Sequence, residues 1–490
     1  MNQNIINDRI KNLDFWRNQG ISGYKNDVKV NHTNQDVQIN HSTQSVEELE
    51  QLSPKPIYQI AGRVMLIRRL GKIAFGTLRD RTGDLQVAFN KRTLDETTFE
   101  NMKHLDLGDI IWVQGTPFRT TAGELTIQVE QMELLTKNMR PLPEKYHGLS
   151  DVETRYRYRY EDLATNLHSR EIFLKRNKIV QYIRQYLLNL DFLEVETPMM
   201  HSLLGGAAAK PFITHHNALD VDLYLRVAPE LHLKRLLVGG FERVFELNRC
   251  FRNEGIDTTH NPEFTSLEFY QSYATYEDLI LLTENLLSSL VGENEITYGE
   301  YKISFKAPFA KMTVKEAIVA YNNNISLEDL ENQNSLQNLA KKLSFDVNLS
   351  ENYGKLLMSI FDVVVEPNLI QPTFITQFPI EVSPLARKNE QNPQFVDRFE
   401  LYIAEMEVAN AFSELNDPQD QKERFLEQVK AKNAGDGEAN DYDEDYIRAL
   451  EIGMPPAAGE GIGIDRLVML LTNSQSIREV LLFPQMKPLI

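Results

Sequence analysis

Residues 241–273, FERVFELNRCFRNEGIDTTHNPEFTSLEFYQSY, constrain the fold of this chain more than any other stretch. A run of alternating apolar and polar residues enters a long polar loop, and a second alternating run follows it. The pattern predicts two antiparallel strands joined by a long tip. Arg252 and Glu254 are predicted to share a face at the end of the outgoing strand, because side chains two residues apart lie on one side. On the return strand the corresponding side chains are Phe264, Ser266, Glu268 and Tyr270. Such a face is typical of a binding site, and a solvated face of an antiparallel sheet is the alternative.

The composition limits the class of protein. With 490 residues, 42% of them hydrophobic and 25% charged, the chain is expected to form two or three globular domains. No apolar run approaches the ~18 residues that a membrane span needs. The N-terminal residues lack the apolar segment of a secretory signal. A single cysteine, Cys250, excludes intrachain disulfides and cysteine-rich zinc sites, so we expect a cytoplasmic protein.

The net charge of −18 taken alone argues against a nucleic-acid partner, because such binding depends on neutralising phosphates. Net charge is a global quantity, however, and a local basic patch is compatible with it. An acidic protein also suits a cationic small substrate.

Five strand-like runs lie between residues 56 and 135: YQIAGRVMLIRRL, KIAFGTLRD, DLQVAFN, DIIWVQGTPFRT and ELTIQVEQMELL. A helical stretch near residues 94–104 separates the third from the fourth, which is the order of an OB-fold barrel. These barrels bind single-stranded nucleic acid through stacking aromatic rings and basic side chains. Phe75, with Arg68 and other arginines around it, fits that use, and a phenylalanine in the barrel core is the alternative.

The remaining organisation follows from composition and periodicity. We expect a helical and irregular extension at 1–50, the barrel at 51–140, a linker at 141–168 and a larger domain at 169–490. Within the larger domain, residues 276–369 are predicted to be a helical insertion and residues 416–450 an acidic, solvated one.

A second chemically dense run is RFELYIAEMEVANAFSELND, residues 398–417. Glu400 and Glu407 lie on opposite faces of one continuous strand, but a reversal near Ile403 would set them opposite each other. Two converging carboxylates would bind Mg²⁺ through oxygen ligands. The second half of the run places Asn410, Phe412 and Glu414 on one face.

Glycines mark two further places. The last dense run, PPAAGEGIGIDRLVMLLTN, passes from a glycine-rich strand to an apolar helix. Its three glycines allow close approach of a phosphate or an adenine ring, with Arg466 at the helix start and Glu460 as an added anion. The Gly205-Gly206 loop is also suited to contact a ligand, and Glu230 begins the helix after Pro229.

Together these runs resemble the class II aminoacyl-tRNA synthetases. FRNEG with HNPEF is similar to the family's motif 2, GIGIDRL to motif 3, and the helix before FLEVETP to motif 1, which forms the homodimer interface. A barrel in front of this core resembles the lysine, aspartate and asparagine subgroup. Within that subgroup, GGAAAKPF, RVAPELHLKRLLVGG and NAFSELNDP resemble the lysine-specific members. The resemblance implies an α+β fold: a five-stranded OB-fold barrel that reads the anticodon, then an antiparallel catalytic sheet flanked by helices.

The resemblance also implies partners and roles. The expected partners are ATP, L-lysine and tRNA(Lys), with Mg²⁺ as cofactor. The expected catalytic arginines are Arg252 and Arg466. The expected ATP contacts are Arg252, Glu254, His260, Asn261, Phe264, Glu400, Glu407, Gly463 and Arg466, and Glu400 and Glu407 would bind the metal. The expected lysine contacts are Gly206, Glu230, Arg252, Glu268, Tyr270, Asn410, Phe412 and Glu414. The expected anticodon contacts are Arg68, Phe75, Gln86 and Glu124.

Three alternatives remain at this point. The first is an aspartyl or asparaginyl enzyme of the same subgroup, against which Glu268 and Glu414 argue, because an anionic substrate requires a cationic pocket. The second is an enzyme that attaches lysine to a protein, a group that lacks the N-terminal barrel. The third is a non-catalytic tRNA-binding paralogue, against which the presence of Arg252 and Arg466 argues.

Overall fold

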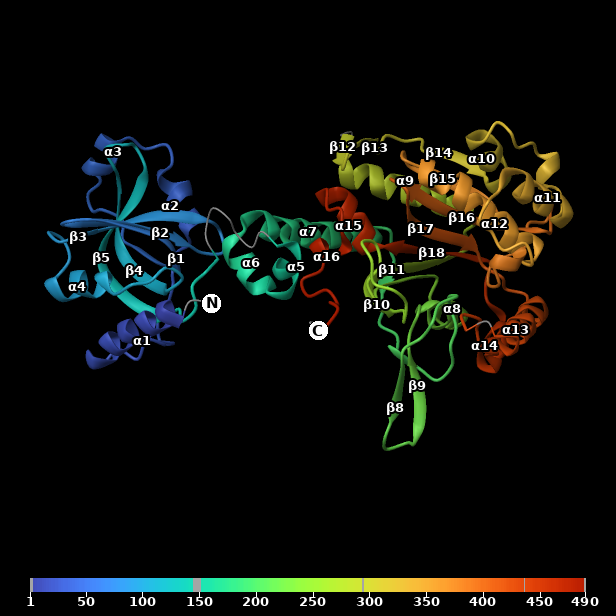
Figure 1. Cartoon of the computed structure of the whole chain (residues 1–490), viewed down its shortest axis with the longest axis horizontal. Helices are drawn as coiled ribbons and strands as arrows, with labels where there is room; N and C mark the ends of the chain where they lie inside the picture. The colour runs from blue at the N-terminus through green and yellow to red at the C-terminus, as the bar shows by residue number, and fades with distance from the viewer. Residues whose placement is uncertain (1–2, 144–150, 293–294, 436, 489–490) are drawn as a thin grey trace. The chain divides into compact units, whose positions relative to one another are not determined.

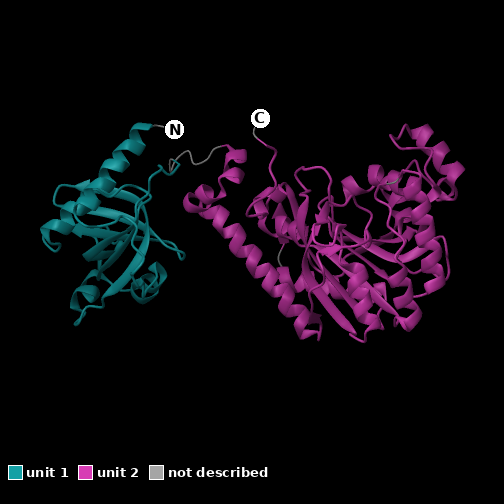
Figure 2. Ribbon diagram, turned by 90° about the horizontal axis from the view of Figure 1, so that it is seen from below, with its two compact units in different colours: residues 1–150 teal, residues 151–490 magenta. Residues whose placement is uncertain are grey.

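The computed structural model describes residues 3–143, 151–292, 295–435 and 437–488. The chain divides into two units, Met1–Ser150 and Asp151–Ile490 (Figure 2). The linker predicted at 141–168 falls partly outside the described residues, which omit 144–150.

The first unit contains a closed five-stranded barrel in the order β1-β2-β3-β5-β4 (Figure 1). Its elements are β1 (Tyr58–Leu70), β2 (Ile73–Arg79), β3 (Asp84–Asn90), α4 (Glu96–Lys103), β4 (Ile110–Arg119) and β5 (Leu125–Thr136). Burial alternates along these strands, and inward residues such as Ile60, Val87 and Val113 form the core. The predicted OB fold, including the position of its helix, is confirmed.

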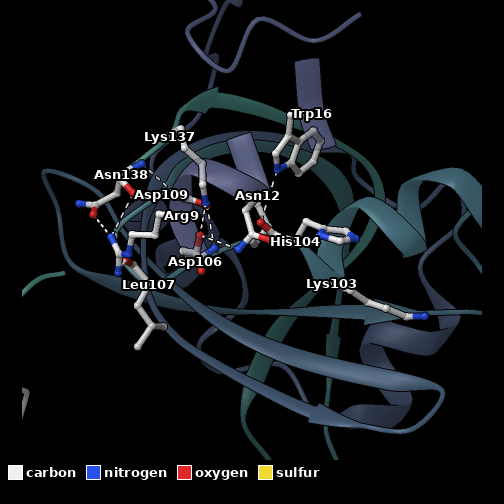
Figure 3. Close-up of polar contacts among 12 residues, drawn as sticks. Arg9, Asn12, Trp16, Lys103, His104, Asp106, Leu107, Asp109, Lys137 and Asn138 are labelled. Atoms are coloured by element: carbon white, nitrogen blue, oxygen red, sulfur yellow. Dashed lines mark hydrogen bonds and ion pairs between the residues drawn. The ribbon is translucent and has the colours of Figure 1, made fainter. Parts of the chain in front are cut away.

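The N-terminal extension contains α1 (Gln3–Asn18), α2 (Asn34–His41) and α3 (Val46–Gln51). The sequence interpretation expected irregular structure in place of α2, whose start is stabilised by a capping box between Thr33 and Asp36. Helix α1 is attached to the barrel by Arg9, which donates hydrogen bonds to the carbonyls of Leu107 and Asn138, both at 3.0 Å (Figure 3).

An eight-stranded sheet forms the centre of the second unit, in the order β14-β15-β16-β17-β18-β11-β10-β6. Its strands are β6 (Leu193–Glu194), β10 (Arg243–Phe251), β11 (Glu263–Ser272), β14 (Ala310–Thr313), β15 (Thr373–Pro379), β16 (Phe395–Ile403), β17 (Met406–Ser413) and β18 (Ala457–Gly463). The sheet is antiparallel from β15 to β10, as predicted. The two edge strands, β14 and β6, pair in parallel with their neighbours, so the sheet is mixed.

Helices cover this sheet in separate apolar clusters. One cluster unites α7 (Leu167–Asn189), α9 (Tyr276–Val291) and α15 (Ile464–Thr472) with residues of the central strands. A second contains α10 (Val314–Tyr321), α11 (Gln333–Leu343) and α12 (Tyr353–Val364). A third packs α8 (Glu230–Val238) against α13 (Pro418–Asn433) and α14 (Glu444–Gly453).

The remaining elements are short. They are α5 (Val152–Arg157), α6 (Arg159–Thr165), β7 (Met200–His201), β8 (Ile213–His216), β9 (Val221–Leu225), β12 (Glu295–Tyr298), β13 (Tyr301–Ser304), η1 (Glu328–Leu330), η2 (Glu366–Asn368), η3 (Ile380–Val382) and α16 (Ile477–Val480). Within the described ranges, no helix is both long and apolar enough to cross a bilayer.

Two regions differ from the sequence interpretation. Residues 276–369 also contain strands, and one of them, β14, joins the central sheet, where its four residues were too few to show a period. Residues 416–450 are not simply solvated, because Phe425, Tyr446 and Ile447 pack against α8. Because this region contains many acidic residues, the sequence interpretation did not identify the apolar face of α14.

Candidate active site

The strand register brings the separate motifs together. On one face of the sheet, two rows of cross-strand partners run across strands that are far apart in the sequence. The first row is Glu400, Asn410, Gly461 and Glu268. The second row is Arg398, Phe412, Gly459 and Tyr270. Each row therefore carries polar or aromatic side chains on both sides of a glycine in β18.

The β18 glycines form the floor between the two walls. A Cβ atom added to Gly459 would collide with the Tyr270 ring and the Glu414 carboxylate. Gly459 therefore lies directly beneath Tyr270 and Glu414. The side chains on both sides can close over the floor because nothing projects from it.

A cavity lies above this floor. The predicted ligand residues that line it are Gly206, Glu230, Arg252, Glu254, His260, Asn261, Phe264, Glu268, Tyr270, Glu407, Asn410, Phe412, Gly463 and Arg466. Glu414 and Glu400 are not on its surface. They are 1% and 8% exposed and stand directly behind it, in contact with lining residues.

One end of the cavity is rich in buried acids. Tyr270 donates a hydrogen bond to Glu268 at 3.2 Å, and both side chains are buried. Burial and the nearby Glu230 raise the pKa of Glu268 to about 8, against the smaller effect of the Tyr270 hydrogen bond. Glu414 Oε1 is buried and has no hydrogen-bond partner among the described residues. This end can accept hydrogen bonds from a cation.

Arg252 lines the cavity. It lies one residue beyond the end of β10, and its guanidinium is 5.1 Å from the centre of the Phe264 ring. Its Nε atom is buried without a hydrogen-bond partner in the described part of the chain. An unpaired buried donor is costly unless a ligand accepts from it, so this position suits an anionic group.

The loop tip connects to Arg466. Hydrogen bonds from the Thr259 and His260 amides lower the pKa of Asp257 to about 2, although burial opposes the shift. The Asp257 carboxylate lies 2.8 Å from His260 Nδ1, and Arg466 Nη2 lies 3.1 Å from His260 Nε2. Asp257 thus fixes the ring of His260, and the Thr258 carbonyl accepts a 2.7 Å hydrogen bond from the Ile477 amide.

The candidate metal carboxylates share a face for an unexpected reason. The chain reverses at Ala404 and Glu405, which both have positive φ. Glu400 pairs with Asn410 and Glu407 pairs with Tyr402, so the two acids are not direct partners as the sequence interpretation had it. An irregularity between Leu401 and Tyr402 leaves an extra residue in β17. This bulge turns Glu407 to the face of Asn410, three residues away.

These acids differ in their surroundings. Glu400 is paired with Arg398 and accepts a 2.6 Å hydrogen bond from the Tyr402 hydroxyl. Glu407 is 40% exposed and its Oε2 lies 3.7 Å from Arg466. The described residues contain no group of three or more His, Cys, Asp or Glu side chains that could bind a metal by themselves. Mg²⁺ is commonly bound by one or two carboxylates plus substrate phosphates, so this donor set fits the ion when a nucleotide supplies the other ligands.

The sequence interpretation placed the Glu460 carboxyl group beside the glycines of β18, but its side chain points away from them. It points to the opposite face of β18, where Thr283 Oγ1 lies 2.6 and 2.7 Å from its two oxygens. Burial raises the pKa of Glu460 well above its ordinary value.

Comparison with known proteins identifies this arrangement. Residues 151–487 match the family described as tRNA synthetases class II (D, K and N), and residues 58–135 match the OB-fold nucleic acid binding domain. The chain belongs to the class II tRNA synthetases.

Three relatives of this synthetase are full-length matches. The lysine–tRNA ligase of Psychromonas ingrahamii is 52% identical over 491 residues, covering 99% of this chain and 96% of the relative. The lysine–tRNA ligase of Escherichia coli K12 is 51% identical over 490 residues, with the same coverages. The heat-inducible lysine–tRNA ligase of the same strain is 51% identical over 492 residues, covering 99% and 97%.

The barrel of this class II tRNA synthetase carries the other predicted residues on its surface. Arg68 and Phe75 are cross-strand partners, and Gln86 donates a 2.9 Å hydrogen bond to Thr126. Phe75 is half-buried and outside the barrel core, which removes the alternative that it is a core residue. Glu124 is exposed just before β5.

Two residues of the synthetase's site were missed by sequence reasoning. Arg398 donates to Asn410 at 3.0 Å and pairs with Glu400, so it connects the two neighbouring residues on one side of the first row. Lys234 is buried between Glu230 and Glu414. Its position four residues after Glu230 in α8 was a visible signal, but such a spacing more often marks an exposed pair.

Proposed function

We propose that this chain is a lysine–tRNA ligase, which joins L-lysine to AMP at the expense of ATP and then transfers it to the 3′ end of tRNA(Lys). The full-length identity of 51–52% with proteins of that name supports the reaction. The observation that carries the substrate is the acidic end of the cavity, where Glu268 and Tyr270 line the surface and the unpaired Glu414 Oε1 is buried beside Tyr270 at the Gly459 floor.

In this proposal lysine lies along the length of the cavity. Its ε-ammonium is placed at Glu268, Tyr270 and Glu414, and its α-ammonium at Glu230 near Gly206. Its carboxylate meets Arg252. Asn410 and Phe412 complete the wall beside the aliphatic stem. A neutral side chain would leave the buried acids unpaired, and such a penalty gives strong discrimination.

ATP occupies the other end in this proposal. Phe264 stacks on adenine, Glu254, Asn261 and Gly463 contact the nucleoside, and His260 and Arg466 meet the outer phosphates. An oxygen of the lysine carboxylate attacks the α-phosphorus, a new P–O bond forms, and the bond to pyrophosphate breaks. Arg252 holds both reacting groups, so the chemistry depends on positioning and charge neutralisation. A hydroxyl of the tRNA 3′ end then attacks the lysyl carbonyl and AMP leaves.

Glu400 and Glu407 would bind Mg²⁺ in this proposal. Bound there, the ion would supply positive charge to neutralise the phosphates. The Glu400 carboxylate would have to leave its ion pair with Arg398 before both of its oxygens could bind the metal. Glu407 already lines the cavity.

The barrel would read the anticodon through Phe75, Arg68, Gln86 and Glu124. A half-buried ring beside a guanidinium is a suitable stacking platform for a base. We also assign homodimer formation to α7 and the segment that follows it, which expose large apolar side chains including Leu174, Leu188 and Met200. Charging of tRNA for translation places the enzyme in the cytoplasm.

A pyrophosphate-exchange assay with each amino acid tests the proposal. Exchange that depends on lysine and ATP is expected. Exchange that depends on aspartate or asparagine would replace the lysine assignment, and no exchange with any amino acid would favour the non-catalytic alternative. Lysylation of tRNA(Lys), and not of a protein, is the second expected result.

A further inference from the structure

The side chain of Lys234 places an ammonium group of the protein itself behind the wall of the amino-acid site. Its side chain is 0% exposed. Its Nζ lies 2.5 Å from Glu230 Oε1, also contacts Glu414 Oε2, and is 5.1 Å from the centre of the Phe412 ring. The proposed function assigns both Glu230 and Glu414 to contacts with the substrate. Lys234 therefore contacts two residues of the amino-acid site directly.

The charges at this end of the cavity can be counted. Glu230, Glu268 and Glu414 provide three carboxylates, and Lys234 provides one ammonium. The neighbouring ion pairs, Arg226 with Glu246 and Arg398 with Glu400, are each neutral. With every group ionised, the end has two uncompensated negative charges. Lysine carries two ammonium groups, and its carboxylate is placed at Arg252.

We propose that Lys234 is a resident counter-ion and positioning residue, which sets the charge of the site to match a substrate with two ammonium groups. The proposal rests on the proposed function. Lys234 uses one oxygen of Glu230 and one of Glu414, and so leaves the other oxygen of each acid for the substrate.

The surroundings of Lys234 support a fixed charge there. Although burial lowers it, the charges of Glu230 and Glu414 raise the pKa of Lys234 above its ordinary value. The other titratable group that faces it is the Tyr446 hydroxyl of α14, which is buried and has no hydrogen-bond partner among the described residues. Without Lys234, three buried acids would face two substrate ammonium groups, and one acid would keep a proton.

The variant Lys234→Met tests the proposal in the full-length chain by pyrophosphate exchange and calorimetry. We expect KM for lysine to rise about 100-fold, because loss of one partner leaves an uncompensated buried charge. KM for ATP should stay within about threefold. Titration with lysine over a range of pH should show the affinity levelling off at a higher pH than in the wild type, because loss of the Lys234 charge raises the pKa of Glu230 and Glu414.

The matched control is Lys137→Met in the barrel, which removes an equally buried lysine between Asp106 and Asp109 (Figure 3). It should leave both KM values and the pH dependence of lysine binding unchanged. If Lys234→Met does not fold, Lys234→Arg decides: it should raise KM for lysine at least about fivefold and leave KM for ATP unchanged, because a guanidinium cannot hold both acids in the same places.

The outcomes are distinct. An unchanged KM for lysine with an unchanged pH dependence of lysine binding in Lys234→Met overturns the proposal. Equal losses for lysine and ATP also overturn it, since they indicate a structural role. Wild-type KM values for both lysine and ATP in Lys234→Arg also overturn the proposal. Failure of the proposed function looks different, because the wild type itself would then show no lysine-dependent exchange.

Discussion

Two buried lysines, one in each unit, have nearly the same surroundings. Lys137 lies between Asp106 and Asp109, and Lys234 lies between Glu230 and Glu414. The acids of the barrel also accept hydrogen bonds from the chain itself, such as the 2.7 Å bond from the Asn138 amide to Asp109. In the catalytic unit, Glu414 Oε1 accepts none among the described residues.

This difference separates a structural ion pair from one that serves a ligand. The Lys137 cluster uses its carboxylate oxygens to hold β4, β5 and the N-terminal extension together, including Asn12 of α1 (Figure 3). The Lys234 cluster stands behind a cavity and keeps acceptors for a cation that the chain does not supply. Burial and ion pairing are the same in both, so unused acceptors beside a cavity are the informative feature.

The largest expected effect comes from removing the buried lysine of the barrel. Lys137→Met should destabilise the barrel by about 3 kcal/mol or more, because Asp106 and Asp109 lose their buried counter-charge. Both tryptophans, Trp16 and Trp112, are in the first unit, so tryptophan fluorescence in urea reports on the barrel alone. Lysine-dependent exchange in the absence of urea is the control. A weakened lysine KM in this variant would mean that the cluster is not purely structural.

The next effect concerns the open acids, the buried carboxyl groups of Glu268 and Glu414 that have acceptors left for a cation. Glu268→Gln should raise KM for lysine about 100-fold, because an amide carries no charge to neutralise the buried ammonium. KM for ATP should change by less than about threefold, because the proposal assigns Glu268 to the lysine ammonium and not to ATP. Exchange kinetics with each substrate varied in turn provide the measurement. Comparable losses for lysine and ATP would contradict a role in the amino-acid pocket.

Several parts of the fold and site follow from local patterns. Alternation at period two was visible in β10, β11 and β18, and it grouped Glu268 with Tyr270 correctly. The same rule also places Glu460 on the face opposite to its glycine neighbours, so its burial against Thr283 could have been predicted. The barrel was predictable because its five runs are each bounded by turn residues.

Other parts depend on contacts that no local pattern contains. The bulge that turns Glu407 toward Asn410 has no glycine to mark it, and the reversal at Ala404 and Glu405 places two non-glycine residues at φ of 50° and 65°. The amides of that turn donate to the Ile370 and Leu369 carbonyls, which stabilise it from outside the hairpin. The burial of Lys234 likewise depends on Glu414, 180 positions later in the numbering.

The open acids should also make lysine binding depend on pH. Because burial raises the pKa of Glu268 to about 8, this group holds a proton at pH 6 and must lose it to bind an ammonium. The affinity for lysine should therefore rise about 50-fold from pH 6 to pH 8 and then level off. Calorimetry across that range measures it, with Glu268→Gln as the control that should weaken the dependence and leave the part due to Glu414, whose pKa burial also raises to about 8. A flat profile would mean that Glu268 is already ionised in the free site.

The smallest expected effect tests whether the barrel has an open surface of its own. Phe75→Ala should lower kcat/KM for tRNA charging about tenfold, because one base loses its stacking platform. Exchange, which needs no tRNA, should be unchanged. The ring is half-buried outside the core, so barrel stability by tryptophan fluorescence should change far less than in Lys137→Met. Loss of barrel stability in parallel with charging would instead mean that Phe75 supports the fold, and the ligand-facing part of the barrel would then lie elsewhere.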